Sequence, residues 1–373
     1  MLLLLIIVAL LAFSGALALP GVMDAAPVAY THLTLAVGGM PLVMGAMTHF
    51  VPVLTRSGAP ERWVRAIPVL ILAAGFMAFF SFVAPLLAAN GHYFAALAGC
   101  ASAGAMAWWI YRRGAASLGK PHPCLYWYLA AVGCLVLALG AIVAMHFWPE
   151  QRLPLRRFHL HLNTLGFIGL TAVGTLQVLL PTAAGRPDGK AAQRLQKDLK
   201  WMLAGILLIA SGAAWLKPLT WLGVLLLAYP IIRLALAWRA LYIREIFRWN
   251  GAAPSLGAAL AGFAVMLLLG VAHGIGATNG ADAVTAYILG FMFPLVTGAS
   301  SQLLPVWVRP GPQGDWHGQA RQRLTNMGGL RAMLFLAAGI ASGLGGRWGT
   351  LLAAAGLGLF ALQLVKSYLV ARA

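Results

Sequence analysis

The chain has 373 residues, of which 61% are hydrophobic and 9% are charged, and its mean hydropathy is +0.84. A soluble domain covers its surface with about 25% charged residues, so this composition excludes a soluble globular protein and predicts lipid as the main solvent. The net charge of +18 would be compatible with binding to nucleic acid. We expect no nucleic-acid partner, however, because the Lys and Arg residues fall in alternate loops between apolar runs, as membrane orientation requires.

Twelve apolar runs, each bounded by Pro, Gly or charged residues, predict about 12 transmembrane helices. The expected fold is therefore all-α, a polytopic membrane protein with a single transmembrane domain over residues 1–373. We interpret the first run as a membrane helix rather than a signal peptide, because no Lys or Arg precedes it. The predicted spans are 2–22, 31–54, 64–88, 92–111, 125–147, 158–181, 200–216, 219–241, 253–273, 278–305, 327–344 and 348–370.

The distribution of basic residues predicts the orientation of the chain. One set of loops and helix ends carries 21 of the 26 Lys and Arg residues, which predicts that this side and both termini are cytoplasmic, in a bacterial inner membrane. Arg152, Arg156 and Arg157 form an exception on the outer side, just before the sixth span. They are either a lipid-headgroup anchor or, for Arg156 and Arg157, a seat for an anionic ligand group such as a porphyrin propionate.

Three of the predicted spans share a sequence pattern. Each begins at a His or a Thr, ends at a proline 20 residues later, and has a glycine at the same place. Glycine-rich faces let helices pack closely in lipid. The four-helix period predicts three four-helix arcs around a pseudo-threefold axis, with pseudo-repeats of about 1–120, 121–245 and 246–373. The three segments are 32–52, 161–181 and 285–305, with the shared glycines Gly45, Gly174 and Gly298.

Twelve helices in three arcs, with a histidine near the outer end of helices 2 and 6, resemble subunit I of the heme–copper oxidases. The resemblance is greatest to the C-family cytochrome oxidases and the nitric oxide reductases, in which a turn similar to PTAAGRPDG at 181–189 follows helix 6. The resemblance implies that His32 lies where the family places its helix-2 ligand to low-spin heme, with b-type heme expected. It also implies that His161 lies where the family places its helix-6 ligand to copper.

The chain departs from the family pattern at the other ligands. The His-x-His of helix 10 is replaced by Ala283 and Thr285, and the histidine pair of helix 7 is missing. We therefore expect no oxygen-reducing binuclear centre. The sixth span has its own His-x-His, His159 and His161, which would let a heme bind between helices 2 and 6 with His32 and one of these rings as axial ligands. Residues two apart on a helix point about 200° apart, so we do not expect both rings to bind one metal.

Two further histidines, His146 and His273, lie near the predicted outer ends of spans and are secondary metal candidates. The competing interpretation of each such ring is a histidine solvated at the membrane interface. No acidic residue lies in the middle of a predicted span, which disfavours an ion-coupled transporter. The candidate cofactor residues are His32, His159, His161, Arg156 and Arg157, and the candidate metal ligands are His32, His161, His159, His273 and His146.

Three functions fit these features. The first is a membrane protein that binds heme, copper or both, and that serves electron transport, nitric oxide chemistry or respiration, with another respiratory-chain or redox subunit as a candidate partner. The second is a carrier or assembly factor for copper or heme. The third is a cofactor-free scaffold subunit. The sequence leaves open whether the chain is an enzyme and what its substrate is.

Overall fold

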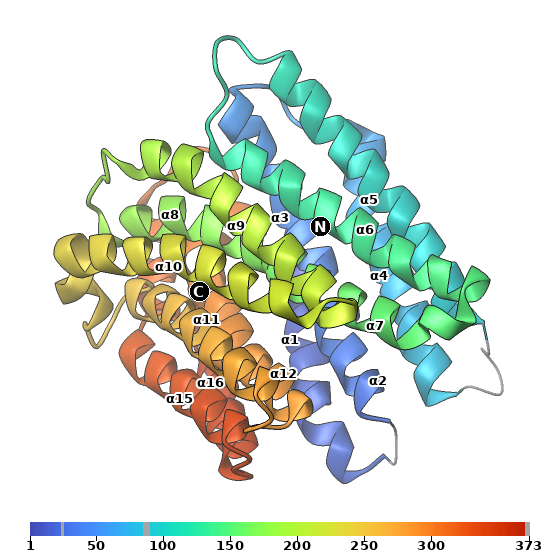
Figure 1. The fold of residues 1–373 in the computed structure, drawn as a ribbon. Helices are drawn as coiled ribbons and strands as arrows, with labels where there is room; N and C mark the ends of the chain where they lie inside the picture. The colour runs from blue at the N-terminus through green and yellow to red at the C-terminus, as the bar shows by residue number, and fades with distance from the viewer. Residues whose placement is uncertain (24–25, 85–89, 370–373) are drawn as a thin grey trace. The chain divides into compact units, whose positions relative to one another are not determined.

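The structure, a computed structural model, describes residues 1–23, 26–84 and 90–369, and these residues are helical apart from short connections (Figure 1). The longer helices, in chain order, are α1 (Leu2–Ala18), α2 (Pro27–His32), α3 (Met40–Thr55), α4 (Arg62–Val83), α5 (Gly91–Ala115), α6 (Cys124–Phe147), α7 (Arg152–His161), α8 (Leu170–Ala184), α9 (Ala191–Ala214), α10 (Lys217–Ile246), α11 (Ala253–Gly274), α12 (Gly280–Tyr287), α13 (Phe293–Val308), α14 (Asp315–Leu324), α15 (Gly328–Gly343) and α16 (Trp348–Leu369).

Eleven helical segments of the described chain are long and apolar enough to cross a membrane. Some are single helices and others join helices end to end, as in Pro27–Thr55, Pro149–Ala184 and Gly280–Val308. Large apolar side chains remain exposed along these segments, as expected where lipid is the solvent. The prediction of an all-α, polytopic integral membrane protein is confirmed.

The predicted span 200–216 lies in α9, which is not among the eleven. The first ten residues of α9 include Arg194, Lys197, Asp198 and Lys200. The apolar remainder, 201–214, rises only about 21 Å, less than the roughly 30 Å of a bilayer core. By its length and composition, α9 therefore does not qualify as a membrane-spanning helix.

The chain folds as two compact units, which are described separately. The first unit comprises Met1–Thr175 and Lys190–Pro230, and the second comprises Leu176–Gly189 and Ile231–Ala373. The arrangement of three four-helix arcs in one domain stays a prediction.

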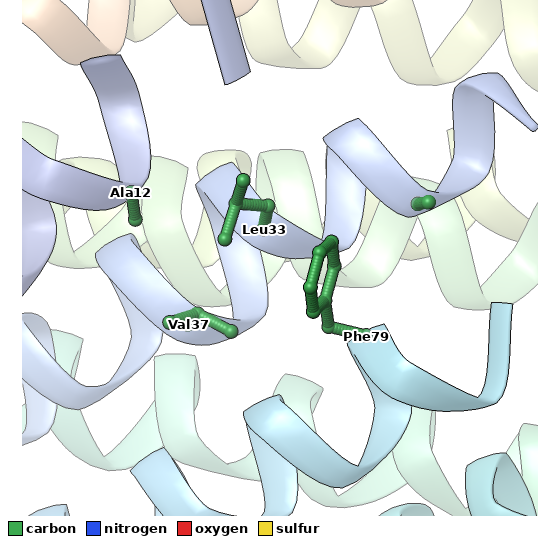
Figure 2. Close-up of a cluster of buried hydrophobic side chains, with 5 residues drawn as sticks. Ala12, Leu33, Val37 and Phe79 are labelled. Atoms are coloured by element: carbon green, nitrogen blue, oxygen red, sulfur yellow. The ribbon is translucent and has the colours of Figure 1, made fainter. Parts of the chain in front are cut away.

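The core of the first unit forms where α1 and α4 pack against the start of the second span. Ala12 of α1, Leu33 and Val37 of the second span, and Phe79 of α4 are all buried there (Figure 2). Gly75 permits this packing, since a Cβ on it would lie 2.2 Å from the backbone oxygen of Ala36. Close packing of this kind needs a residue without a side chain.

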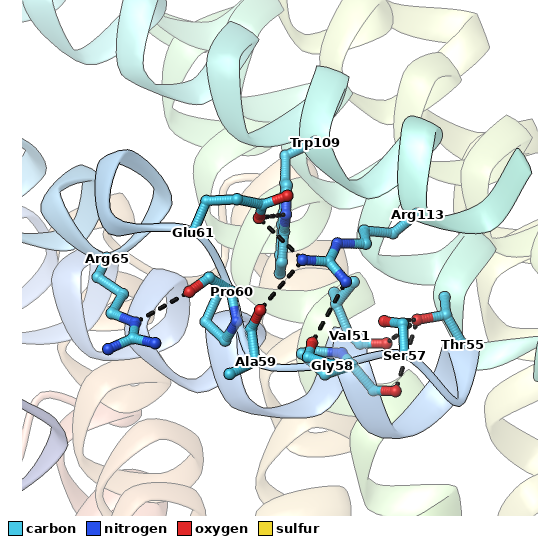
Figure 3. A network of polar contacts seen from close by, with 11 residues as sticks. Val51, Thr55, Ser57, Gly58, Ala59, Pro60, Glu61, Arg65, Trp109 and Arg113 are labelled. Atoms are coloured by element: carbon cyan, nitrogen blue, oxygen red, sulfur yellow. Dashed lines mark hydrogen bonds and ion pairs between the residues drawn. The ribbon is translucent and has the colours of Figure 1, made fainter. Parts of the chain in front are cut away.

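A polar network fixes one end of the first unit (Figure 3). It joins the loop between α3 and α4 to the last turns of α5. The guanidinium of Arg113 donates to the backbone oxygens of Gly58 and Ala59, each at 3.2 Å, and to Glu61 Oε2 at 2.9 Å. The indole of Trp109 donates to the same carboxylate oxygen at 2.9 Å. Because Arg113 hydrogen-bonds and attracts the carboxylate, the pKa of Glu61 is lowered from its ordinary value.

Each of the three sequence-related spans contains a π-helical segment, η2 (Leu33–Gly39), η4 (Leu162–Gly169) and η5 (Ile288–Met292). The segments overlap when the three spans are aligned on their final prolines. π-Helices are rare and occur frequently at functional sites. The sequence pattern therefore corresponds to a shared local backbone geometry.

In the second unit, glycines bring three helices together around η5. A Cβ on Gly262 of α11 would lie 1.8 Å from the backbone oxygen of Gly290, and one on Gly339 of α15 would lie 2.5 Å from Gly290 Cα. The helices that flank η5 are therefore in backbone contact with it. The same device, a glycine against a carbonyl of the π segment, appears in the first unit at Gly75.

Candidate functional site

His32 ends α2 and immediately precedes the π segment η2. Its Nδ1 lies 2.8 Å from the backbone oxygen of Val28, one helical turn earlier. A carbonyl oxygen only accepts hydrogen bonds, so this contact places the proton on Nδ1 and leaves the lone pair on Nε2. Metal-ligating histidines are commonly oriented in this way, by a bond from the second ring nitrogen to a carbonyl.

His159 is positioned similarly, but by a neighbouring helix. Its Nδ1 donates to the backbone oxygen of Ala138 of α6 at 2.9 Å, so its lone pair is also on Nε2. The side-chain nitrogen of Asn163 lies 3.2 and 3.3 Å from the two ring nitrogens. An amide nitrogen at this distance from both ring nitrogens would clash with Cε1 if it lay in the ring plane, so it lies out of that plane, away from the direction of either lone pair.

His32 and His159 lie in the same region of the first unit, since a charge on His32 would be felt at the His159 ring. Both are half-buried and both belong to the first unit. Two imidazoles with fixed orientation and available Nε2 atoms are the donor set that a heme with two axial histidines requires. The residues present therefore fit that group at its ligands.

Asn163 adds an unsatisfied polar atom beside His159. Its nitrogen donates to the backbone oxygen of His159 at 3.1 Å, while its buried Oδ1 has no hydrogen-bond partner. A buried acceptor without a donor is unfavourable by about 1–3 kcal/mol and is uncommon in native structures. Such an atom is the kind of feature that marks a site for a further group.

A row of aromatic rings extends from His32 in the first unit. The ring of His32 lies 4.7 Å from that of Phe82, and Phe82 lies 5.9 Å from His92. His92 contacts Tyr93 at 4.1 Å, and Tyr93 contacts the exposed His146 at 5.3 Å. His146, a predicted metal candidate, is thus part of this row of rings rather than of the His32 and His159 pair.

The hydrogen bonds and exposure of the other predicted residues differ from those of His159. The Nδ1 of His161 bonds to the backbone oxygen of Arg157 at 2.8 Å, within its own helix, whereas His159 bonds to α6. Arg156 and Arg157 are exposed on α7. His273 is exposed at the end of α11 in the second unit, with Nδ1 3.1 Å from the backbone oxygen of Thr278.

Within the described ranges, no three His, Cys, Asp or Glu side chains converge in a way that would hold a metal ion. The predicted copper site is therefore not assembled by the candidate residues, and the heme and metal assignments stay predictions.

Sequence reasoning missed Asn163, Phe82 and Tyr93. Asn163 lies four residues after His159, a spacing that places two side chains on one helix face, so this neighbour was within reach of pattern analysis. Phe82 carries no such signal, because its contacts with His32 and His92 depend on how α4 packs against α2 and α5. Tyr93 directly follows His92 in the sequence, but its contact with His146 depends on how α5 packs against α6.

Comparison with known proteins gives one partial similarity. No model of a known protein family matches the chain. A segment of 58 residues is 36% identical to cytochrome c oxidase subunit 1 of Thermus thermophilus and covers 15% of this chain. The match spans 54% of that protein, or about half of its length. The chain is thus a polytopic membrane protein with a weak relation, at most, to the heme–copper oxidase superfamily.

Proposed function

We propose that this protein binds heme in the membrane, with His32 and His159 as the two axial ligands. The observation that carries the proposal is the matched state of the two rings. Each Nδ1 is held by a backbone oxygen, at 2.8 Å for His32 and 2.9 Å for His159, and both rings belong to the first unit. His159 is preferred to His161 because its Nδ1 is fixed by a neighbouring helix, α6, whereas the Nδ1 of His161 bonds within its own helix.

A heme bound by both imidazoles would supply one-electron transfer. The residues of the chain then act by orientation. The backbone oxygens of Val28 and Ala138 fix the ring planes and raise the basicity of the ligating nitrogens. Arg156 and Arg157, exposed on the same helix as His159, are the proposed partners of the propionates.

The proposed role is therefore electron transfer linked to respiration or to nitric oxide chemistry, with another redox subunit as the partner. Copper remains a second candidate cofactor, with His161 as the ligand that the family resemblance implies. The similarity to cytochrome c oxidase subunit 1 supports this class of function over an unrelated one. The predicted location is the inner membrane of a bacterium with both termini cytoplasmic, on the distribution of basic residues.

The test is a reduced-minus-oxidised optical spectrum of the detergent-purified chain, expressed with ample heme, with iron, copper and zinc measured on the same sample. We expect a sharp low-spin heme signal in roughly equimolar amount, as a two-histidine site requires. His32→Ala and His159→Ala should each abolish it, whereas His161→Ala should retain it.

The matched control is His122→Ala, in the loop before α6, which should leave the spectrum unchanged. A flat spectrum from folded wild-type protein would contradict the proposal. Copper or zinc alone would then indicate a carrier, and no metal at all would indicate a scaffold. Loss of heme in His161→Ala but not in His159→Ala would reject the assignment of His159.

A further inference from the structure

A hollow of about 280 Å³ lies at the end of α10 in the second unit. Its charged lining comes from Arg186, in the segment after α8, and from Arg244 and Glu245 in the last turn of α10. Ala240, Leu241 and Ile243 complete it. The hollow therefore combines two guanidinium groups and one carboxylate with an apolar wall.

The charges in the hollow are only partly compensated. Arg186 Nη1 lies 3.3 Å from Glu245 Oε1, and the Arg186 side chain is still 55% exposed. The side chain of Arg244 takes no part in the hydrogen bonds and ion pairs of the described residues. Arg248 also interacts electrostatically with Glu245. Arg186 and Arg248 thus interact with one carboxylate while Arg244 stays uncompensated, which favours a ligand with a negative charge.

Glu245 indicates that the ligand also carries a hydrogen-bond donor. The residue is 6% exposed, and its buried Oε2 has no hydrogen-bond partner. A carboxylate with one unsatisfied oxygen needs a hydrogen-bond donor beside it. A fully deprotonated anion such as chloride or sulfate supplies negative charge without such a donor, whereas a headgroup that carries hydroxyls supplies both.

An apolar strip leads along α10 to the hollow. Ile232, Leu236 and Ile243 are 57%, 58% and 42% exposed, and their spacing of four and seven residues places them on one helix face. Phe247 and Trp249, just beyond the helix end, are 80% and 53% exposed. Exposed aromatic residues next to arginines are typical of the boundary between hydrocarbon and headgroups.

We propose that this hollow binds an anionic phospholipid whose headgroup carries hydroxyl groups. The phosphodiester lies between the guanidinium groups of Arg186 and Arg244, a headgroup hydroxyl lies beside Glu245, and an acyl chain follows the Ile232, Leu236 and Ile243 face. The hydroxyl of Tyr242 donates to the backbone oxygen of Arg186 at 3.0 Å, which holds the segment after α8 against α10.

The experiment measures retention of phosphatidylglycerol and phosphatidylcholine by the delipidated full-length chain, with native mass spectrometry as the readout. Wild type should retain phosphatidylglycerol preferentially. Arg244→Gln should weaken that retention roughly five- to tenfold, because one charge-assisted contact is lost. This variant is informative because Arg244 supports none of the described internal contacts.

Arg239→Gln is the matched control, since Arg239 is an exposed arginine of the same helix that does not line the hollow. It should leave retention unchanged. Equal loss in both variants, or equal retention of the two lipids by wild type, would overturn the proposal. So would displacement of phosphatidylglycerol by millimolar inorganic phosphate, because that result would indicate a site for a free anion.

Discussion

His32 in the first unit and Thr285 in the second unit occupy the same position of the sequence pattern, and they make the same local contact. The Nδ1 of His32 bonds to the oxygen of Val28 at 2.8 Å, and the hydroxyl of Thr285 bonds to the oxygen of Ala281 at 3.0 Å. Each bond reaches back four residues. After that bond the imidazole still has Nε2 for a ligand, whereas the threonine has no donor of comparable strength to iron.

The comparison shows that the two units share a backbone feature but differ in the side chains beside it. Both units place a glycine of an adjacent helix, Gly75 or Gly262, against a carbonyl of a π segment. The first unit adds a histidine pair and an unsatisfied Asn163 at this place. The second unit instead buries an arginine network further along its helices. A shared backbone therefore carries a proposed ligand site in one unit and a purely structural core in the other.

The largest loss of stability is expected from Gly262→Ala. This substitution disrupts the packing of a glycine against a carbonyl of a π segment, which the two units share. A Cβ there would meet the backbone oxygen of Gly290 at 1.8 Å, and backbone atoms cannot give way as a flexible side chain does. We expect a loss of about 3 kcal/mol or more in unfolding free energy, measured by thermal unfolding in detergent.

Gly270→Ala on the same helix is the control for this change. Nothing lies within 4 Å of the Cβ that Gly270 would gain, so the substitution should be neutral or stabilising by up to about 1 kcal/mol. Equal stability of the two variants would show that α11 does not pack against η5 as described.

The next largest loss of stability is expected at Arg331, which is fully buried in the second unit. Its guanidinium donates to the backbone oxygen of Leu324 at 3.2 Å, to Ser301 Oγ at 3.0 Å and to Gln363 Oε1. Arg331→Ala removes these donors and leaves a cavity, so we expect destabilisation by about 2–5 kcal/mol. The folded fraction should keep its heme spectrum, since this network is structural.

The exposed Arg347 of the same unit is the matched control for Arg331, and Arg347→Ala should change the stability by less than about 0.5 kcal/mol. If Arg331→Ala removed the heme signal from folded protein, the proposed separation of chemistry and scaffold between the units would be wrong.

The smallest effect is a pH dependence in the first unit. The pKa of Glu61 is lowered from 4.5 by the hydrogen bond and charge of Arg113, so its ion pair stabilises the folded state above pH 4.5. This contribution falls as the pH drops below 4.5 towards the lowered pKa. Because the Glu61 side chain is 49% exposed, the contribution should not exceed about 1 kcal/mol.

The measurement is the melting temperature of wild type and Glu61→Gln between pH 7 and pH 3. Wild type should be slightly more stable near neutrality, and the difference should shrink as the pH falls below 4.5. A difference that grew on acidification would contradict the described ion pair.

The fold was largely predictable because lipid imposes it. Apolar runs of about 20 residues must become helices when no water can satisfy the backbone, so the predicted span 125–147 corresponds closely to α6 (Cys124–Phe147). The prediction was least accurate where charge enters a helix, as in α9. The π segments were not predicted, although η2, η4 and η5 fall in the three spans that share the sequence pattern.

The candidate site was predictable only in part. Spacing selected His32 and the His159 and His161 pair, but it did not decide which ring of the pair faces the neighbouring helix. That choice depends on the rotation of α7 against α6, which the contact of His159 with Ala138 reveals. Periodicity gives the relative directions of two side chains on one helix. It does not show which of the two side chains faces a neighbouring helix such as α6.

The most direct test of the central claim is the electron paramagnetic resonance spectrum of oxidised wild type and His32→Thr. This variant places the residue of the second unit at the equivalent position of the first. Threonine repeats the bond to the Val28 oxygen, so the fold should persist with nearly unchanged thermal stability. Wild type should show a low-spin ferric signal from two imidazole ligands, and His32→Thr should lose it. A low-spin signal that survives unchanged in His32→Thr would contradict the account.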